Sequence, residues 1–246
     1  MSSRRTTEEE RQAANPLQFY RTPPWATWAV VKWRQHQLRK ARVLELGSGD
    51  GMIAAEILSC PPLQIKEYVA VELDPGRAQL LREKIEPLGA VVIEGDATCL
   101  DPELGLFDVV VMNPPFDKAH IFLLAAAGYL NPCGIVLMLQ RCTYPGESQT
   151  DRDKLFKHDN EVGATLGFFA ELTLTNRIDF KGDGRADSVN HSWFAFQPNC
   201  VYPRGFKATR EHVRRALCPW DANREPELAR QKWVEQKKQL SLLETT

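Results

Sequence analysis

The 246-residue chain predicts an α/β fold: a doubly wound sheet of seven mostly parallel strands with an antiparallel hairpin at one edge. Between residues 41 and 142, apolar strand patterns alternate with helical patterns. This alternation is typical of parallel strands covered by helices on both faces. Beyond residue 142 the alternation stops. Two further strand patterns, 166–180 and 191–198, are joined there by a glycine-containing loop, which favours the hairpin.

The elements are expected in a regular order along the chain. Pro23 and Pro24 suit the start of a helix in which Trp25, Trp28 and Trp33 recur at helical spacing. The following elements are strand 41–46, helix 52–58, strand 67–73, helix 77–85, strand 90–97, a strand within 106–116, helix 118–130 and strand 134–142. We expect a mobile or weakly helical arm at 1–15, one α/β domain at 16–200, and a helical, basic extension at 201–246.

Composition excludes several classes of protein. The net charge is −1, so any attraction to nucleic acid must be local. The six cysteines form no C-x-x-C pair and no zinc pattern with histidine, so we expect reduced thiols, a cytoplasmic protein and no metal site. The charged N-terminus is unlike a signal peptide, and no apolar run is long enough to span a membrane.

Each of the first four strands ends in a polar cluster. The clusters are Glu45–Gly51, Glu72–Pro75, Glu94–Ala97 and Asn113–Phe116. In an open α/β sheet, ligands bind beyond the carboxyl ends of the strands, where the strand order reverses. We therefore expect these four clusters to line one ligand site.

The first three clusters indicate a nucleoside ligand without a pyrophosphate. The turn G-S-G-D-G lacks the G-x-G-x-x-G spacing of nicotinamide cofactor sites, and its acids Glu45 and Asp50 suit a ligand with a cationic group. Glu72 is placed to accept both ribose hydroxyls, and Asp96 to accept the exocyclic amine of an adenine. S-adenosylmethionine (SAM) combines an adenosine, a sulfonium cation and an amino-acid tail.

With these motifs, residues 17–200 resemble the Rossmann-like class I SAM-dependent methyltransferases, in the branch that carries N-P-P-[YF]. The segment "FYRTPP" resembles the N-terminal segment that closes over SAM in DNA adenine methyltransferases; a simple helix start is its alternative explanation. The cofactor-binding residues that the resemblance implies are Tyr20, Thr22, Pro23, Glu45, Gly47, Ser48, Gly49, Glu72, Leu73, Asp96, Ala97 and Asn113.

The catalytic residues expected are Asn113, Pro114, Pro115 and Phe116. The exocyclic amine of a base is a poor nucleophile, because its lone pair is delocalised into the ring. The side-chain oxygen of Asn113 and the carbonyl of Pro114 can each accept a hydrogen bond from it, which stabilises the positive charge that develops on nitrogen. The prolines stiffen the turn, and Phe116 offers a face on which a flipped base can stack. A proline-rich strand exit with a core Phe is the alternative.

The region after residue 142 resembles phage-type DNA adenine-N6 methyltransferase-like proteins. Arg177, Lys181, Arg185 and His191 surround its glycine-containing loop, and we expect them to contact nucleic acid, although a solvated hairpin is an equal explanation. The main expectation is methylation of adenine N6 in DNA, with DNA favoured over RNA as partner. An RNA adenine-N6 or guanine-N2 methyltransferase, a protein-glutamine methyltransferase and a SAM-binding subunit of a larger complex stay open. No separate target-recognition domain follows, so a partner subunit or a homodimer is possible.

Overall fold

The computed structural model describes residues 19–144, 166–198 and 214–217. The expected arm at 1–15 and most of the expected extension at 201–246 lie outside these residues. Among the helices of the described part, none is both long and apolar enough to cross a membrane.

An eight-stranded sheet forms the centre of the molecule, in the order β3-β2-β1-β4-β5-β7-β6-β8. β7 is antiparallel to its neighbours β5 and β6, and the other strand pairs are parallel. The strands are β1 Arg42–Leu46, β2 Glu67–Glu72, β3 Val91–Glu94, β4 Phe107–Met112, β5 Leu130–Arg141, β6 Leu166–Thr173, β7 His191–Pro198 and β8 Arg214–Leu217. The first seven are the strands that the sequence predicts, so the predicted fold class is confirmed.

β8 is an addition to the predicted strands and replaces the expected helix at residues 214–217 alone, because the rest of the extension lies outside the described residues. Residues 214–217 pair in parallel with β6 and extend the sheet beyond the hairpin. The local sequence favours a helix there, but an open sheet edge offers backbone hydrogen bonds that override weak local propensity.

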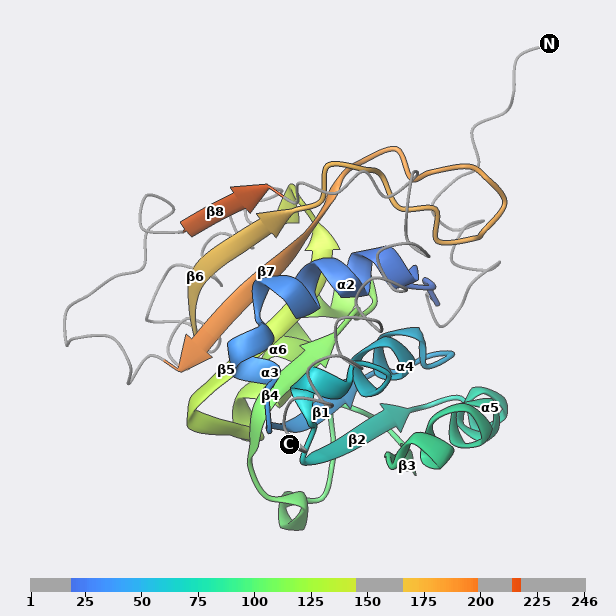
Figure 1. The fold of residues 1–246 in the computed structure, drawn as a ribbon, viewed down its shortest axis with the longest axis vertical. Helices are drawn as coiled ribbons and strands as arrows, with labels where there is room; N and C mark the ends of the chain where they lie inside the picture. The colour runs from blue at the N-terminus through green and yellow to red at the C-terminus, as the bar shows by residue number, and fades with distance from the viewer. Residues whose placement is uncertain (1–18, 145–165, 199–213, 218–246) are drawn as a thin grey trace, which may run out of the picture.

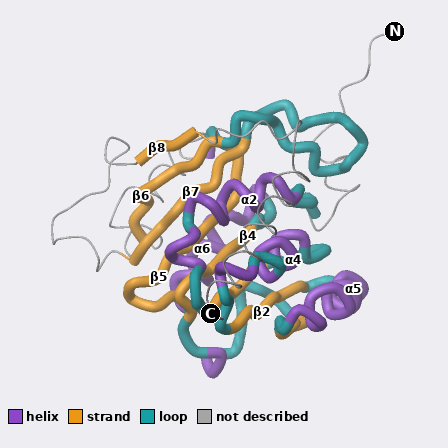
Figure 2. Tube along the Cα trace, viewed as in Figure 1, coloured by secondary structure: helices purple, strands orange, loops and turns teal. Residues whose placement is uncertain are grey.

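Helices cover both faces of the sheet. α2, α4 and α5 contribute to one hydrophobic cluster and α6 to the other, and Figures 1 and 2 show α2, α4 and α5 in front of the strands. The helices are α2 Pro24–Trp33, α3 Gln35–Leu38, α4 Met52–Leu58, α5 Pro75–Ile85 and α6 Ala119–Gly128. Proline occupies the first turn of α2 and α5, where its missing N–H is not needed, and the Asp74 carboxylate caps α5 by accepting from the N–H of Arg77.

The central strands are buried on both faces. In β4, Val109 and Val111 belong to the cluster beneath α2 and α4, whereas Val110 and Met112 belong to the cluster beneath α6. This explains why the strand reads as a continuous apolar run. Its carboxyl end at Met112 leads directly into Asn113, beside the end of β1, and this is the point where the strand order reverses.

Candidate active site

A cavity of about 500 Å³ lies beyond the carboxyl ends of β1, β2, β3 and β4. Its lining includes most of the expected site residues: Tyr20, Thr22, Glu45, Gly47, Ser48, Gly49, Glu72, Leu73, Asp96, Ala97, Asn113 and Pro115. Among the expected cofactor-binding and catalytic residues, Pro23, Pro114 and Phe116 do not line it, and neither do the expected substrate contacts Arg177, Lys181, Arg185 and His191. The lining also includes residues that the sequence did not predict, among them Phe19, Met52, Arg77 and Lys118.

The glycine turn after β1 allows the Phe19 ring to pack closely against it. Gly49 has a φ of +56°, and a Cβ at this position would lie 2.6 Å from a ring carbon of Phe19. Only glycine fits both the left-handed backbone and the contact. The Phe19 ring therefore lies directly against the backbone of the glycine turn.

Glu72 at the end of β2 is buried and already holds three hydrogen bonds. Its Oε2 accepts from the N–H of Gly49 (2.8 Å), and its Oε1 accepts from the N–H of Asp74 (2.9 Å) and from Arg77 Nε (3.1 Å). A carboxylate has about four acceptor sites. Binding both ribose hydroxyls, as the sequence analysis expects, therefore requires Arg77 Nε to leave. The sequence did not predict the contact between Arg77 and Glu72, because it arises from the position of Arg77 in the first turn of α5 and not from a motif.

Asp96 after β3 has one oxygen held by its own turn. Oδ1 accepts from the hydroxyl (2.7 Å) and the N–H (2.8 Å) of Thr98, and these hydrogen bonds lower the pKa of the carboxyl. Oδ2 makes no hydrogen bond to any residue in the described ranges. An ionised carboxylate with one open oxygen is suited to accept from an exocyclic amine.

Glu45 at the end of β1 is a buried acid facing the same cavity. The hydroxyl of Tyr68 donates to Glu45 Oε2 (2.6 Å). Burial raises the pKa of Glu45 to about 8, the Tyr68 hydrogen bond opposes this, and the nearby carboxylates of Asp50 and Glu72 add to it. A cationic ligand group beside Glu45 would restore its ionised form. The cavity therefore fits SAM: it offers a buried acid for the cationic end and acceptors for the adenosine.

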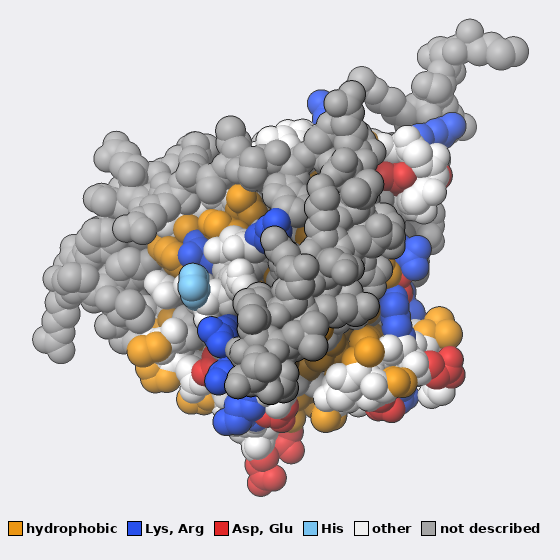
Figure 3. Space-filling model, in the orientation of Figure 1, with side chains coloured by type: hydrophobic (Ala, Val, Ile, Leu, Met, Phe, Trp, Pro, Cys, Tyr) orange, Lys and Arg blue, Asp and Glu red, His pale blue; other side chains and the backbone are white. Residues whose placement is uncertain are grey.

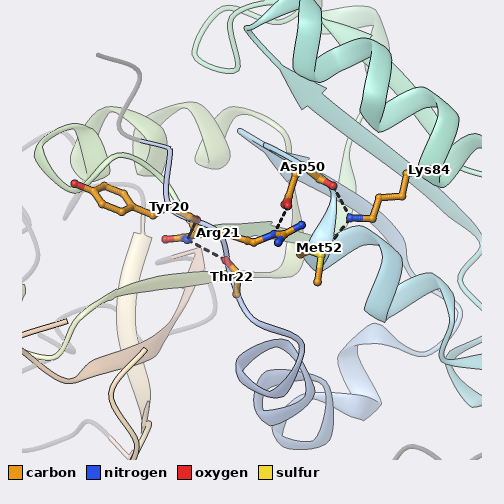
Figure 4. Close-up of polar contacts among 7 residues, drawn as sticks. Tyr20, Arg21, Thr22, Asp50, Met52 and Lys84 are labelled. Carbon is orange, nitrogen blue, oxygen red and sulfur yellow. Dashed lines mark hydrogen bonds and ion pairs between the residues drawn. The ribbon is translucent and has the colours of Figure 1, made fainter. Parts of the chain in front are cut away.

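The segment Phe19–Pro23, which we name the strap, lies against the cavity. Figure 4 shows the Arg21 side chain extending to Asp50, while the Tyr20 ring points the opposite way. Lys84 Nζ donates to the backbone carbonyl of Asp50 (2.7 Å), which braces the glycine turn from α5. The strap is thus fixed to the cofactor side of the cavity through Arg21.

The strap also fixes Asn113. Asn113 Nδ2 donates to the backbone carbonyl of Tyr20 (2.9 Å) and to Thr22 Oγ1 (2.9 Å). A carbonyl can only accept, so the amide nitrogen must face Tyr20. The other end of the amide, Oδ1, is buried without a hydrogen-bond partner among the described residues. The Asn113 Oδ1 acceptor is therefore held in a fixed orientation and is left without a hydrogen-bond donor among the described residues.

Phe116 does not present the open stacking face that the sequence predicts. The Tyr20 ring stacks on it, with ring centroids 4.7 Å apart and planes 10° apart. The rings of Phe180 and His191 complete an aromatic cluster around it. The reason is long-range: the strap and the loop joining β6 to β7 both fold onto the turn after β4. A base can stack on this face only after the Tyr20 ring moves away.

The loop joining β6 to β7, residues 174–190, is the hairpin loop. In Figure 1 it passes over the start of α2. Asp179 accepts from the N–H groups of Lys181, Gly182 and Gly184 at 3.1, 2.8 and 2.7 Å, which organises the turn. Arg177, Lys181 and Arg185 are exposed, as a nucleic-acid contact requires.

His191 corrects the expected nucleic-acid contact. Its side chain is fully buried beside Phe116 and Phe180, with Nε2 3.5 Å from Asp187 Oδ2. Its pKa is lowered to about 4: burial lowers it most, the Asp187 carboxylate opposes this, and the Arg141 guanidinium adds to the lowering. His191 is therefore neutral and is not an exposed basic contact. Its position at the start of β7 places it in the core.

Comparisons with known proteins agree with this geometry. The profile of a family described as "Conserved hypothetical protein 95" matches residues 26–164. A curated relative from Methanosarcina barkeri, named "Probable ribosomal RNA small subunit methyltransferase A", is 33% identical over 75 residues, which cover 30% of this chain and 24% of that protein. The chain thus spans about a quarter of the length of this relative.

Two solved structures have a similar fold. One is a proposed RNA methyltransferase from Pyrococcus horikoshii, with a TM-score of 0.57 and 22% identity over 73% of this chain and 86% of that chain. The other is a proposed class I S-adenosylmethionine-dependent methyltransferase from Listeria monocytogenes, with a TM-score of 0.62 and 14% identity over 89% of this chain and 71% of that chain. The fold is that of class I SAM-dependent methyltransferases.

Proposed function

The chain belongs to the Conserved hypothetical protein 95 family, and from this premise we propose that it transfers a methyl group from SAM to an exocyclic amine of a base in RNA. The open, oriented Oδ1 of Asn113 carries the proposal. RNA replaces the expected DNA, because the two proteins compared above whose names specify a substrate both name RNA.

A free acceptor at the end of β4 suits amine methylation. Nitrogen gains positive charge as it attacks a methyl group, and a fixed acceptor dipole stabilises that charge without having to reorient. Asn113 has no useful basicity, so it acts by accepting a hydrogen bond from the amine. The carbonyl of Pro114 is the second acceptor in this proposal. The two prolines hold both acceptors on a rigid turn.

The cavity residues hold the cofactor in this proposal. SAM supplies the activated methyl group. Glu45 faces its cationic end, Glu72 binds the ribose once Arg77 has moved, and Asp96 Oδ2 accepts from the adenine amine. Gly49 allows Phe19 of the strap to pack against the glycine turn beside the cofactor. The residues of this chain therefore position the two reactants and exclude water, which supplies much of the rate enhancement in transfers of this kind.

The hairpin loop supports an RNA contact. The carboxylate of Asp179 is engaged by backbone N–H groups, and Asp183 Oδ1 accepts from the N–H of Arg185. The side chains of Lys181 and Arg185 make no ion pair with any residue in the described ranges. On the face in Figure 3, basic and acidic side chains are interspersed, so attraction to phosphates must come from local groups such as these.

The first experiment supplies methyl-labelled SAM with ribosomal RNA, single-stranded RNA, duplex DNA, single-stranded DNA and a protein extract in parallel, followed by digestion and identification of the labelled product. We expect labelled N-methyl nucleosides from RNA. Asn113→Ala should lower the transfer rate about 100- to 1000-fold, because one acceptor is lost from the transition state. SAM binding by the same variant should stay nearly unchanged.

One control variant and two contrary outcomes complete this test. Glu103→Gln, an exposed residue remote from the cavity lining, should retain full activity. Label in DNA alone would restore adenine N6 of DNA as the substrate. Full transfer by Asn113→Ala would refute the acceptor mechanism, whatever the substrate.

A further inference from the structure

Arg141 and His191 form a polar pair beside the catalytic turn. Arg141 is the last residue of β5, His191 is the first of β7, and the two lie directly opposite each other in the antiparallel register. Two residues along each strand, Leu139 and Trp193 form the next pair on the same side and belong to the cluster that also contains Phe180. Side chains two residues apart on a strand share a face. The Arg141–His191 pair therefore faces the aromatic cluster.

Both members of the pair contact Phe116. The Arg141 Cζ lies 4.9 Å from the centroid of the Phe116 ring, and the His191 ring centroid lies 5.5 Å from it. Tyr20 and His191 also contact the same two rings, those of Phe116 and Phe180. A planar group that takes the place of the Tyr20 ring therefore enters the cluster to which His191 belongs.

The pair carries buried polar atoms that packing alone does not explain. Arg141 Nε and both ring nitrogens of His191 are buried without a hydrogen-bond partner among the described residues. Such atoms destabilise the fold, and apolar side chains at these positions would avoid this. A buried polar group without a partner therefore needs an explanation, and a ligand that supplies the missing hydrogen bonds is one.

The hydrogen-bonding character of the pair is defined. Arg141 can only donate. The carboxylate of Asp187 lies 3.5 Å from His191 Nε2 and favours the proton there, which leaves Nδ1 as an acceptor. The two residues thus offer one donor and one acceptor from neighbouring strands, and this combination complements the edge of a nucleobase.

We propose that Arg141 and His191 are the specificity-determining pair, and that they bind the hydrogen-bonding edge of the target base while its amine faces Asn113. This inference rests on the proposed function. The ligand is a planar heterocycle with a ring nitrogen or carbonyl acceptor for Arg141 and an N–H donor for His191. Tyr20 holds the stacking position on Phe116 until the base enters.

Two variants test the pair: Arg141→Met, which keeps the length of the side chain, and His191→Phe, which keeps an aromatic ring in the cluster. Each should lower kcat/KM on the labelled RNA about 10- to 100-fold, the usual effect of one lost contact to a base edge. Each should also broaden the set of labelled nucleosides, which a merely structural residue would not do. Arg39→Met, at an exposed arginine directly after α3, is the matched control and should leave the choice of base unchanged.

A measurement without substrate separates binding from a structural role. Because each substitution removes buried polar atoms that have no partner, the Tm of the free protein should stay equal or rise. A lower Tm together with an unchanged choice of base would overturn the inference. If the unmodified protein labels no nucleic acid at all, the proposed function fails. If it labels RNA and both variants keep its selectivity, the specificity-determining pair alone fails.

Discussion

Replacing Glu45 with Gln would test the buried acid of the cofactor cavity. The amide keeps an oxygen that can accept from the Tyr68 hydroxyl but removes the ionisable group. The Glu45 side chain is 1% exposed, and burial raises its pKa from 4.5 to about 8. The folded protein therefore holds this proton over a pH range in which the unfolded chain has released it.

The sign and size of the effect follow from the two pKa values. The favourable contribution of protonated Glu45 is fully present below pH 4.5 and is lost as the pH rises to about 8. At 1.36 kcal/mol per pH unit, the loss between these limits is about 4–5 kcal/mol. Glu45→Gln does not titrate, so its free energy of unfolding should exceed that of the unmodified protein increasingly with pH, until the difference levels off above pH 8.

Denaturant unfolding without ligand, at a series of pH values, measures this difference directly. Glu103→Gln, an exposed acid, is the control and should track the unmodified protein. If a cationic ligand group binds beside Glu45, SAM affinity should also rise with pH up to about 8 in the unmodified protein and stay flat in Glu45→Gln. Parallel stability curves for Glu45→Gln and the unmodified protein would refute a raised pKa at Glu45.

Two further predictions concern the strap and the hairpin loop. Gly49→Ala should lower the free energy of unfolding by about 2–4 kcal/mol, because its Cβ meets the Phe19 ring at 2.6 Å and its φ is positive. Gly182→Ala, with a positive φ but nothing within 4 Å, should lower it by only about 1–2 kcal/mol; equal losses in denaturant unfolding would mean that the strap contact contributes nothing. The double change of Lys181 and Arg185 to Ala should weaken RNA binding and lower the slope of log affinity against log salt by about 2, measured by fluorescence anisotropy. An unchanged slope would mean that Lys181 and Arg185 belong to a solvated hairpin and do not contact RNA.

The strands and the open acceptor could be predicted because both depend on local sequence. Apolar runs ended by polar residues identify β1, β2 and β4, and the carboxyl ends of parallel strands necessarily meet at one edge. Asn113 can be identified from the local sequence, since Pro114 and Pro115 directly follow it. The structure adds the two bonds that orient its amide.

The remaining features depend on packing between distant segments. In the sequence, His191 is a polar residue next to a basic loop. In the structure it pairs opposite Arg141, and its side chain is buried in the core. Arg77 carries no motif, yet the first turn of α5 directs it to Glu72. The Tyr20 ring reaches Phe116 because the strap bonds to Asp50 after β1 and to Asn113 after β4. None of these contacts leaves a periodic or compositional signal in one sequence.

The two bonds that hold the Asn113 amide join residues 91 and 93 positions apart in the chain. The strap precedes β1, and Asn113 follows only after four strands, β1 to β4. Contacts of such long sequence separation form slowly, because the intervening chain must first be ordered. The orientation of the Asn113 amide therefore marks a late stage of folding: a protein whose sheet has formed but whose strap has not docked keeps its core and lacks an oriented acceptor.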